Sequence, residues 1–129
     1  MIVGVGTDLV SVARLAEVVA RQGDRFLERV LSPEERSSWP TLPEGQARFL
    51  ARRWAAKEAF AKAYGTGIRG EVALNAVIVG HDPLGKPQLS YAGQLAKKME
   101  ERRLHAHLSI SDEHDYALAF VVIESDGAA

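Results

Sequence analysis

Apolar and small residues recur at helical spacing between residues 44 and 64, and this pattern predicts one long central helix that ends at Gly65. At about 100° per residue, the aromatic residues Phe49, Phe60 and Tyr64 gather on one side, as in a helix that lies on a hydrophobic core. The other side carries Glu58 and Lys62 in a stripe that otherwise consists of Ala47, Ala51, Trp54, Ala55 and Ala61. We expect this second side to be free for a ligand or another chain.

The rest of the chain divides into shorter strand and helix patterns. Period-two alternation or a short apolar run predicts strands at residues 2–10, 71–79, 105–111 and 116–124. Capping residues and helical spacing predict helices at residues 11–22, from Ser32 onward, and at 92–103, with a type I turn at 82–85. The order, about β-α-α-α-β-β-α-β-β, favours an α+β domain with the central helix packed on a mainly antiparallel sheet.

Length and composition limit the class of protein. A chain of 129 residues with 47% hydrophobic residues suffices for one domain, which we expect at 1–124, followed by a flexible tail at 125–129. The sequence contains no cysteine for a disulfide and no apolar run long enough to cross a membrane, and we expect a soluble, cytoplasmic protein. A net charge of −1 argues against nucleic acid as a partner, so an acidic protein partner would need a local basic patch.

Asp8 is the first candidate functional residue, because it shares one face of the first strand with Gly4 and Gly6. The two glycines could mark a bulge or close packing against another element. They could equally leave room for the Asp8 carboxylate, a metal ion and a phosphate group near the backbone. The pattern leaves both interpretations open.

Glu58, Lys62 and the glycines after them form the second candidate site. Glu58 and Lys62 are four residues apart, in the order that favours a salt bridge on the helix surface. Gly65, Thr66 and Gly67 could turn several backbone N–H groups to one side and form an anion-binding nest. A carboxylate, an ammonium group and a nest at one helix end make a metal-and-phosphate site the functional alternative to a plain surface ion pair.

Two segments resemble the signatures of a known family, the 4′-phosphopantetheinyl transferases. They are Gly4-Val5-Gly6-Thr7-Asp8-Leu9 and Trp54-Ala-Ala-Lys-Glu-Ala-Phe-Ala-Lys-Ala-Tyr-Gly-Thr-Gly67, and a third, weaker match is His107-Leu-Ser-Ile-Ser. Their order and separation are similar to those of the small, single-unit branch, and the resemblance covers residues 1–124. It implies the fold of that family and transfer of the phosphopantetheine group of coenzyme A to a serine of apo acyl carrier protein, in fatty acid biosynthesis.

The resemblance also implies roles for individual residues. Asp8 and Glu58 would hold Mg²⁺, Lys62 would contact the diphosphate of coenzyme A, and Glu58, or else Asp8, would be the base for the serine. The implied coenzyme A pocket consists of Arg53, Lys62, Gly65, Thr66, Gly67, Pro87, His107, Ser109 and Ser111. The implied surface for acyl carrier protein consists of Arg14, Val18, Arg21, Arg25 and Phe26. The family further implies a homotrimer with active sites between subunits.

Alternatives to these roles stay open. An arginine stripe is also typical of a solvated helix face, and Arg48 and Arg52 compete with Arg53 as the holder of the 3′-phosphate of coenzyme A. The spacing of His105 and His107 suits zinc, but no cysteine or further well-placed histidine completes such a site. The alternative function is a coenzyme A or nucleotide-binding module without transferase activity. An RNA-binding sheet would display aromatic residues where this chain has a polar row.

Overall fold

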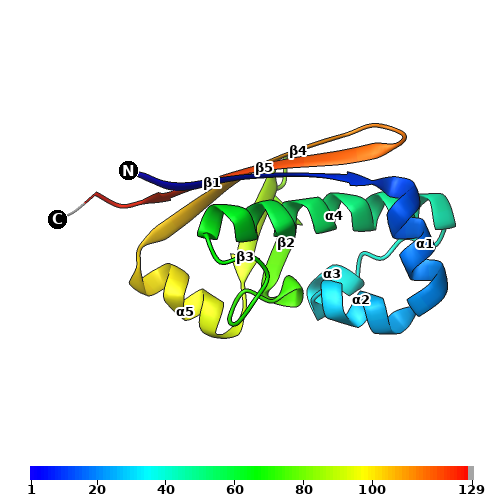
Figure 1. The fold of residues 1–129 in the computed structure, drawn as a ribbon, viewed down its shortest axis with the longest axis horizontal. Helices are drawn as coiled ribbons and strands as arrows, with labels where there is room; N and C mark the ends of the chain where they lie inside the picture. Colours follow the sequence, from blue (N-terminus) through cyan, green and yellow to red (C-terminus); the bar gives the residue numbers. More distant parts are fainter. Residues whose placement is uncertain (128–129) are drawn as a thin grey trace.

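The computed structural model describes residues 1–127 (Figure 1). Its elements are β1 (Ile2–Ser11), α1 (Val12–Gln22), α2 (Asp24–Val30), α3 (Pro33–Arg36), α4 (Pro43–Tyr64), η1 (Leu74–Ala76), β2 (Val77–His81), β3 (Pro87–Tyr91), α5 (Gly93–Glu101), β4 (Leu104–Asp112) and β5 (Tyr116–Ser125). The α+β class and the long central helix are confirmed. Within residues 1–127 no helix combines the length and the apolar character that a membrane span requires. Ser125 still belongs to β5, and residues 128 and 129 of the expected tail lie outside the described residues.

Helix α4 lies between two layers (Figure 1). On one side, β1, β5 and β4 form an antiparallel sheet in that order. On the other side lie the antiparallel hairpin β2–β3 and the helices α2, α3 and α5. We expected the Glu58 side of α4 to be open to a ligand or another chain. This expectation is wrong for most of the helix, because four residues of that side are buried: Ala47, Ala51, Ala55 and Ala61. Of that stripe, only Trp54, Glu58 and Lys62 keep appreciable exposed surface.

Gly4 and Gly6 allow β1 to lie directly on α4. A Cβ atom at Gly4 would overlap the backbone oxygen of Ala63, and one at Gly6 would overlap the backbone oxygen of Ala59. Because these obstacles are backbone atoms, no rotation of a side chain could relieve them. Close packing is thus the role of the glycines, and Asp8, next on the same face, comes to rest beside α4.

One of two boundaries is confirmed and the other differs from the prediction. Helix α1 ends at Gln22, as predicted; Gly23, which follows it, has a φ of 56° in the left-handed region, so Arg25 belongs to a separate helix, α2. The strand expected at 71–79 begins only at Val77, because the 3₁₀ turn η1 precedes it. Leu74 in that turn is buried, and buried apolar residues in a turn resemble a strand when only the sequence is considered.

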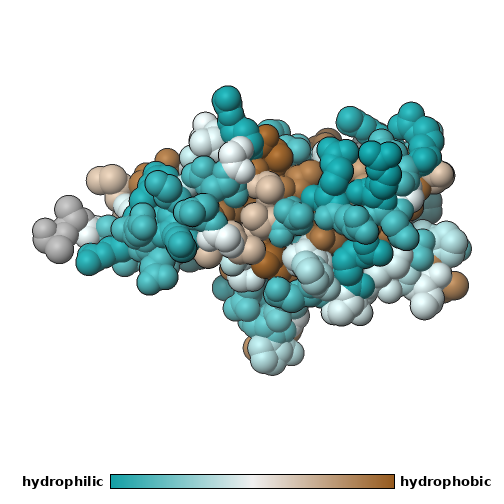
Figure 2. Space-filling model, turned by 90° about the horizontal axis from the view of Figure 1, so that it is seen from below, coloured by the Kyte–Doolittle hydropathy of each residue, from teal (hydrophilic) through white to brown (hydrophobic). Residues whose placement is uncertain are grey.

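The outer face of the three-stranded sheet, which looks away from α4, exposes large apolar side chains. They alternate along β1 and β5 and comprise Val3, Val5, Leu9, Tyr116, Leu118 and Phe120. The opposite face of the molecule is mostly hydrophilic, with apolar surface visible in a band between hydrophilic groups (Figure 2). The outer face of the sheet therefore presents apolar side chains to solvent or to another chain.

Candidate active site

Asp8, Glu58 and Lys62 meet where β1 crosses α4. Lys62 Nζ lies 3.2 Å from Asp8 Oδ1 and donates a hydrogen bond to the backbone oxygen of Thr7 at 2.9 Å. The Asp8 side chain is 17% exposed, whereas that of Lys62 is 53% exposed and reaches the cluster from its rim. Lys62 thus pairs with β1, and the cluster joins two elements that are far apart in the sequence.

Glu58 is half-buried near Asp8, and this position raises its pKa above the ordinary value. Burial is the larger cause, the charge of Asp8 adds to it, and Lys62 opposes both. A cation would relieve the repulsion between the two carboxylates, and Mg²⁺ accepts carboxylates together with water and phosphate oxygens. Within residues 1–127 no group of three or more acidic or histidine side chains is arranged to hold a metal, so the chain offers a pair of carboxylates, not a complete cage.

Replacing Asp8 tests this coupling. We expect Asp8→Asn, which keeps the size of the side chain, to lower the pKa of Glu58 toward its ordinary value, because one cause of the shift is removed. Glu58 then stays ionised down to a lower pH than in the parent protein. The measurement is an NMR titration of the Glu58 carboxyl carbon in both proteins. Identical titration curves would mean that the two carboxylates do not interact.

The glycine cap at the end of α4 is not the open nest expected from the sequence. Gly65 ends the helix with a φ of 102°, as predicted, and its N–H donates to the backbone oxygen of Ala61 at 3.0 Å. The N–H of Gly67 donates to the same oxygen at 3.2 Å. Two of the three N–H groups are therefore used inside the cap. In the described part of the chain, the N–H of Thr66 is the one that remains for a ligand.

Four of the residues predicted near the nucleotide lie away from the cluster of Asp8, Glu58 and Lys62. They are Pro87, His107, Ser109 and Ser111. Pro87 and His107 line one hollow between β3 and β4, so the structure brings these two together. His107 Nε2 also lies 2.7 Å from Glu124 Oε1. Ser109 and Ser111 follow His107 along the exposed face of β4. Because β5 separates β4 from β1, one chain does not bring these side chains to the cluster of Asp8 and Glu58.

Arg53 lies far round α4 from Glu58. Arg53 precedes Glu58 by five residues and so lies about 140° round the helix from it, on the side of the other layer. Its Nε is 3.2 Å from Glu35 Oε2, its guanidinium carbon is 3.8 Å from the centre of the Phe49 ring, and its side chain is 8% exposed. Arg53 therefore does not share a surface with Asp8 and Glu58 of the same chain; its charge lies toward His81 of β2.

The five residues predicted to contact acyl carrier protein border two adjoining hollows at α1 and α2. Both hollows are lined by Gln22 and Arg29, which places them side by side. One contains Arg14, Val18 and Phe26, and the other contains Arg21 and Arg25. The arginines thus form a local basic patch on a chain whose net charge is −1.

Phe26 differs from the expected exposed contact. It is 6% exposed and stacks on Trp54, with the ring centres 5.8 Å apart, so it belongs to the floor of the hollow. Trp54 lines the same hollow and lies one helical turn before Glu58 on α4. The basic hollow therefore adjoins the cluster of Asp8, Glu58 and Lys62.

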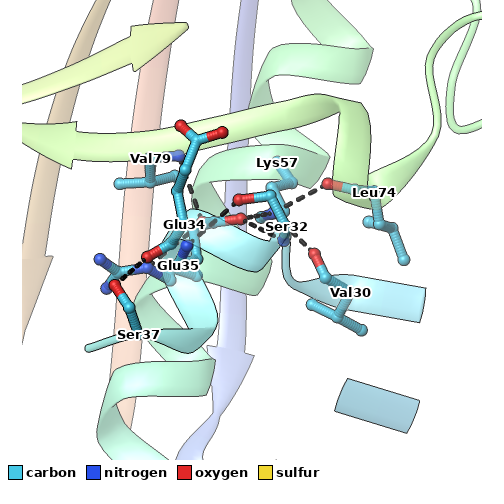
Figure 3. A network of polar contacts seen from close by, with 9 residues as sticks. Val30, Ser32, Glu34, Glu35, Ser37, Lys57, Leu74 and Val79 are labelled. Atoms are coloured by element: carbon cyan, nitrogen blue, oxygen red, sulfur yellow. Dashed lines mark hydrogen bonds and ion pairs between the residues drawn. The ribbon is translucent and has the colours of Figure 1, made fainter. Parts of the chain in front are cut away.

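A buried polar network around Lys57 was not foreseen from the sequence (Figure 3). Lys57 is fully buried, and its Nζ donates to Glu35 Oε1 at 2.6 Å and to the backbone oxygens of Val30 at 2.6 Å and Leu74 at 2.8 Å. Burial lowers the pKa of Lys57 to about 8, and Glu35 opposes this effect. The capping box predicted from the sequence pairs Glu35 with Ser32. No local pattern indicates that Glu35 also binds a lysine 22 residues further along the chain.

Residues 4–121 match the family described as the 4′-phosphopantetheinyl transferase superfamily. The chain belongs to this superfamily. It is 51% identical over 125 residues to the holo-[acyl-carrier-protein] synthase of Azoarcus sp. (strain BH72), which covers 97% of this chain and 99% of the relative. It is 52% identical over 124 residues to the holo-[acyl-carrier-protein] synthase of Dechloromonas aromatica (strain RCB), covering 96% and 98%.

Solved structures of this superfamily share the fold. Holo-[acyl-carrier-protein] synthase from Neisseria meningitidis has a TM-score of 0.90 and 48% identity, over 97% of this chain and 100% of that chain. A holo-(acyl-carrier-protein) synthase from Bacillus anthracis, in complex with CoA (3′,5′-ADP), has a TM-score of 0.82 and 38% identity, over 98% and 99%. The relatives and the structures agree with the resemblance found in the sequence, down to its small, single-unit branch.

Proposed function

We propose that this chain transfers the 4′-phosphopantetheine group of coenzyme A to a serine hydroxyl of apo acyl carrier protein, and that Asp8, Glu58 and Lys62 surround the reacting phosphorus. The products are holo acyl carrier protein and adenosine 3′,5′-bisphosphate. We further propose that residues 1–125 act as one domain, and that the reaction serves fatty acid biosynthesis in the cytoplasm. Similarity to holo-[acyl-carrier-protein] synthases over nearly the whole chain supports this function.

The contact of β1 with α4 is the observation that carries the proposal, because it brings two carboxylates and an ammonium group together at one point of the helix. Asp8 and Glu58 fit Mg²⁺, since a divalent cation would relieve the repulsion that contributes to the raised pKa of Glu58. When bound there, Mg²⁺ would polarise the diphosphate of coenzyme A and stabilise negative charge on the leaving group.

The chain's own groups would align the substrates and move the proton. Displacement at the phosphorus of a diphosphate needs alignment and charge neutralisation more than covalent help. Lys62, exposed at the rim, would contact the phosphate oxygens, and the N–H of Thr66 would donate to them from the end of α4. Glu58 would accept the proton of the serine hydroxyl, for which a carboxylate with a raised pKa is the better base.

A second subunit would complete the nucleotide end of the site. Pro87, His107, Ser109 and Ser111 lie across the sheet from Asp8, with β5 in between. The outer face of that sheet exposes the apolar side chains of β1 and β5, which is the kind of surface that subunits bury. We therefore propose a homotrimer in which Asp8, Glu58 and Lys62 of one subunit face the nucleotide residues of its neighbour. Arg53 would contact coenzyme A from that neighbour.

Intact-mass spectrometry tests the function. Apo acyl carrier protein is incubated with this protein, coenzyme A and Mg²⁺, and a parallel sample contains EDTA. The proposal predicts a gain of one phosphopantetheine group that EDTA abolishes. Bound coenzyme A without any gain in mass would favour the alternative, a coenzyme A-binding module without transferase activity.

The basic hollow gives a prediction about the carrier protein. We expect Arg14→Ala to raise the KM for acyl carrier protein roughly fivefold, the effect of losing about 1 kcal/mol of ion pairing, and to leave the KM for coenzyme A unchanged. Lys97→Ala, which removes an exposed charge on α5, is the matched control and should change neither constant. Steady-state kinetics with each substrate varied in turn makes the measurement. An equal rise in both constants for Arg14→Ala would contradict a docking role.

A further inference from the structure

Lys57 connects α4 to three segments of the layer opposite the sheet. Its three acceptors are the backbone oxygen of Val30 at the end of α2, the carboxylate of Glu35 in α3, and the backbone oxygen of Leu74 in η1. With three acceptors for three N–H groups, the buried ammonium is fully paired. A buried charge that loses its partners is costly, so this geometry holds α4 firmly against that layer.

Glu35 extends the connection to β2 and adds a second contact with α4. Its Oε1 also accepts a hydrogen bond from the N–H of Ser32 at 3.0 Å, and its Oε2 accepts one from the N–H of Val79 in β2 at 3.2 Å. Its Oε2 lies 3.2 Å from Nε of Arg53, one turn before Lys57 on α4. The side chain of Glu35 is 1% exposed, so water does not compete for these contacts. Figure 3 shows these groups converging between α3, α4 and β2.

The two contacts of α4 oppose each other across the helix. On one side, Gly4 and Gly6 let β1 touch the backbone of α4 at Ala59 and Ala63. On the other side, Lys57 is tied to the opposite layer. Glu58 is the residue directly after Lys57, so a shift of the helix at Lys57 must move Glu58 relative to Asp8.

We propose that Lys57 is a positioning residue for the transfer reaction: by tying α4 to Glu35, Val30 and Leu74, it fixes the place of Glu58 beside Asp8. The inference rests on the proposed function and adds a residue that, being fully buried, does not touch coenzyme A or acyl carrier protein. A displacement of about 1 Å at a catalytic group can cost on the order of 100-fold in rate. The network therefore acts on the reaction through geometry alone.

Lys57→Met, which keeps the length of the side chain and removes its charge, is the first test. We expect kcat to fall roughly tenfold or more and the Mg²⁺ concentration for half-maximal rate to rise, because Glu58 shifts away from Asp8. Leu95→Ala is the control for lost stability alone, since Leu95 is a fully buried residue of α5 with no polar contact to the network. It should lower the Tm but leave the Mg²⁺ requirement unchanged. A Lys57→Met protein with a lowered Tm and the parent's kcat and Mg²⁺ requirement would overturn the proposal.

Glu35→Gln is the second test of the positioning role of Lys57, and it replaces the first if Lys57→Met does not fold. It keeps an acceptor for Lys57 but loses the negative charge, so we expect a smaller loss of kcat and a smaller rise in the Mg²⁺ requirement than in Lys57→Met. Parental values of both would overturn the proposal. A crystal structure of Lys57→Met separates this inference from the proposed function, because it needs no turnover. The carboxylate of Glu58 should lie farther from that of Asp8 than in the parent protein. An unchanged separation of the two carboxylates would count against positioning even if the protein had no transferase activity.

Discussion

Glu58→Gln is expected to lower the Mg²⁺-dependent rate of carrier-protein modification by at least about 100-fold. The substitution removes one of the two carboxylates proposed to hold the metal, an effect worth several kcal/mol, together with the proposed base. The new side chain has nearly the same size and is uncharged at a half-buried position, so the fold should survive. The measurement is the initial rate as a function of Mg²⁺ concentration, with the Tm recorded for each protein.

Glu101→Gln is the matched control for Glu58→Gln. Glu101 is an exposed glutamate at the end of α5 and should give parental rates at every Mg²⁺ concentration. If Glu58→Gln also kept the parental rate at limiting Mg²⁺, Glu58 would have no place in the metal site. A loss of rate that accompanies unfolding would instead show that the carboxylate serves the fold.

Gly6→Ala is expected to destabilise the protein by about 3 kcal/mol or more and to abolish most of its activity while it is still folded. A Cβ atom at this buried position would overlap the backbone oxygen of Ala59 and lie 2.7 Å from the backbone nitrogen of Ala63. Either the strand or the helix must move, and each movement takes Asp8 away from Glu58. Denaturant unfolding measures the change in stability, and the transfer rate well below the Tm measures the change at the site.

Gly80→Ala is the control for Gly6→Ala, because Gly80 is also a strand glycine but has open space where its Cβ would be. It should leave the free energy of unfolding and the rate close to those of the parent protein. Parental stability and rate in Gly6→Ala would contradict the close approach of β1 to α4. A stable but inactive Gly6→Ala protein would place the effect at the site alone.

The parts of the fold that could be predicted are those with local signals. Alternation along β1 put Gly4, Gly6 and Asp8 on one face, and the structure confirms that this face meets α4. The capping residues Ser11 and Ser32 also accept the hydrogen bonds expected of them. In these cases the side chains that form the structure are neighbours in the sequence, so spacing alone reveals them.

The parts that could not be predicted depend on contacts between distant segments. A helical wheel shows which residues of α4 share a side, but it does not show that a second layer covers the side of Ala51 and Ala55. The same limit hid the pairing of both Lys57 and Arg53 with Glu35. Whether a chain buries a lysine depends on the acceptors that the fold brings to it, and these have no signature near the lysine itself.

The most direct test of the proposed site is a crystal structure with Mn²⁺ and coenzyme A, with the metal located by its anomalous signal. We predict one peak per active site within coordination distance of both Asp8 and Glu58, with the nucleotide against Pro87 and His107 of a neighbouring subunit. A peak at His107 and Glu124, which lie 2.7 Å apart, would contradict the proposed metal site. A nucleotide held entirely within one chain would contradict the shared active site.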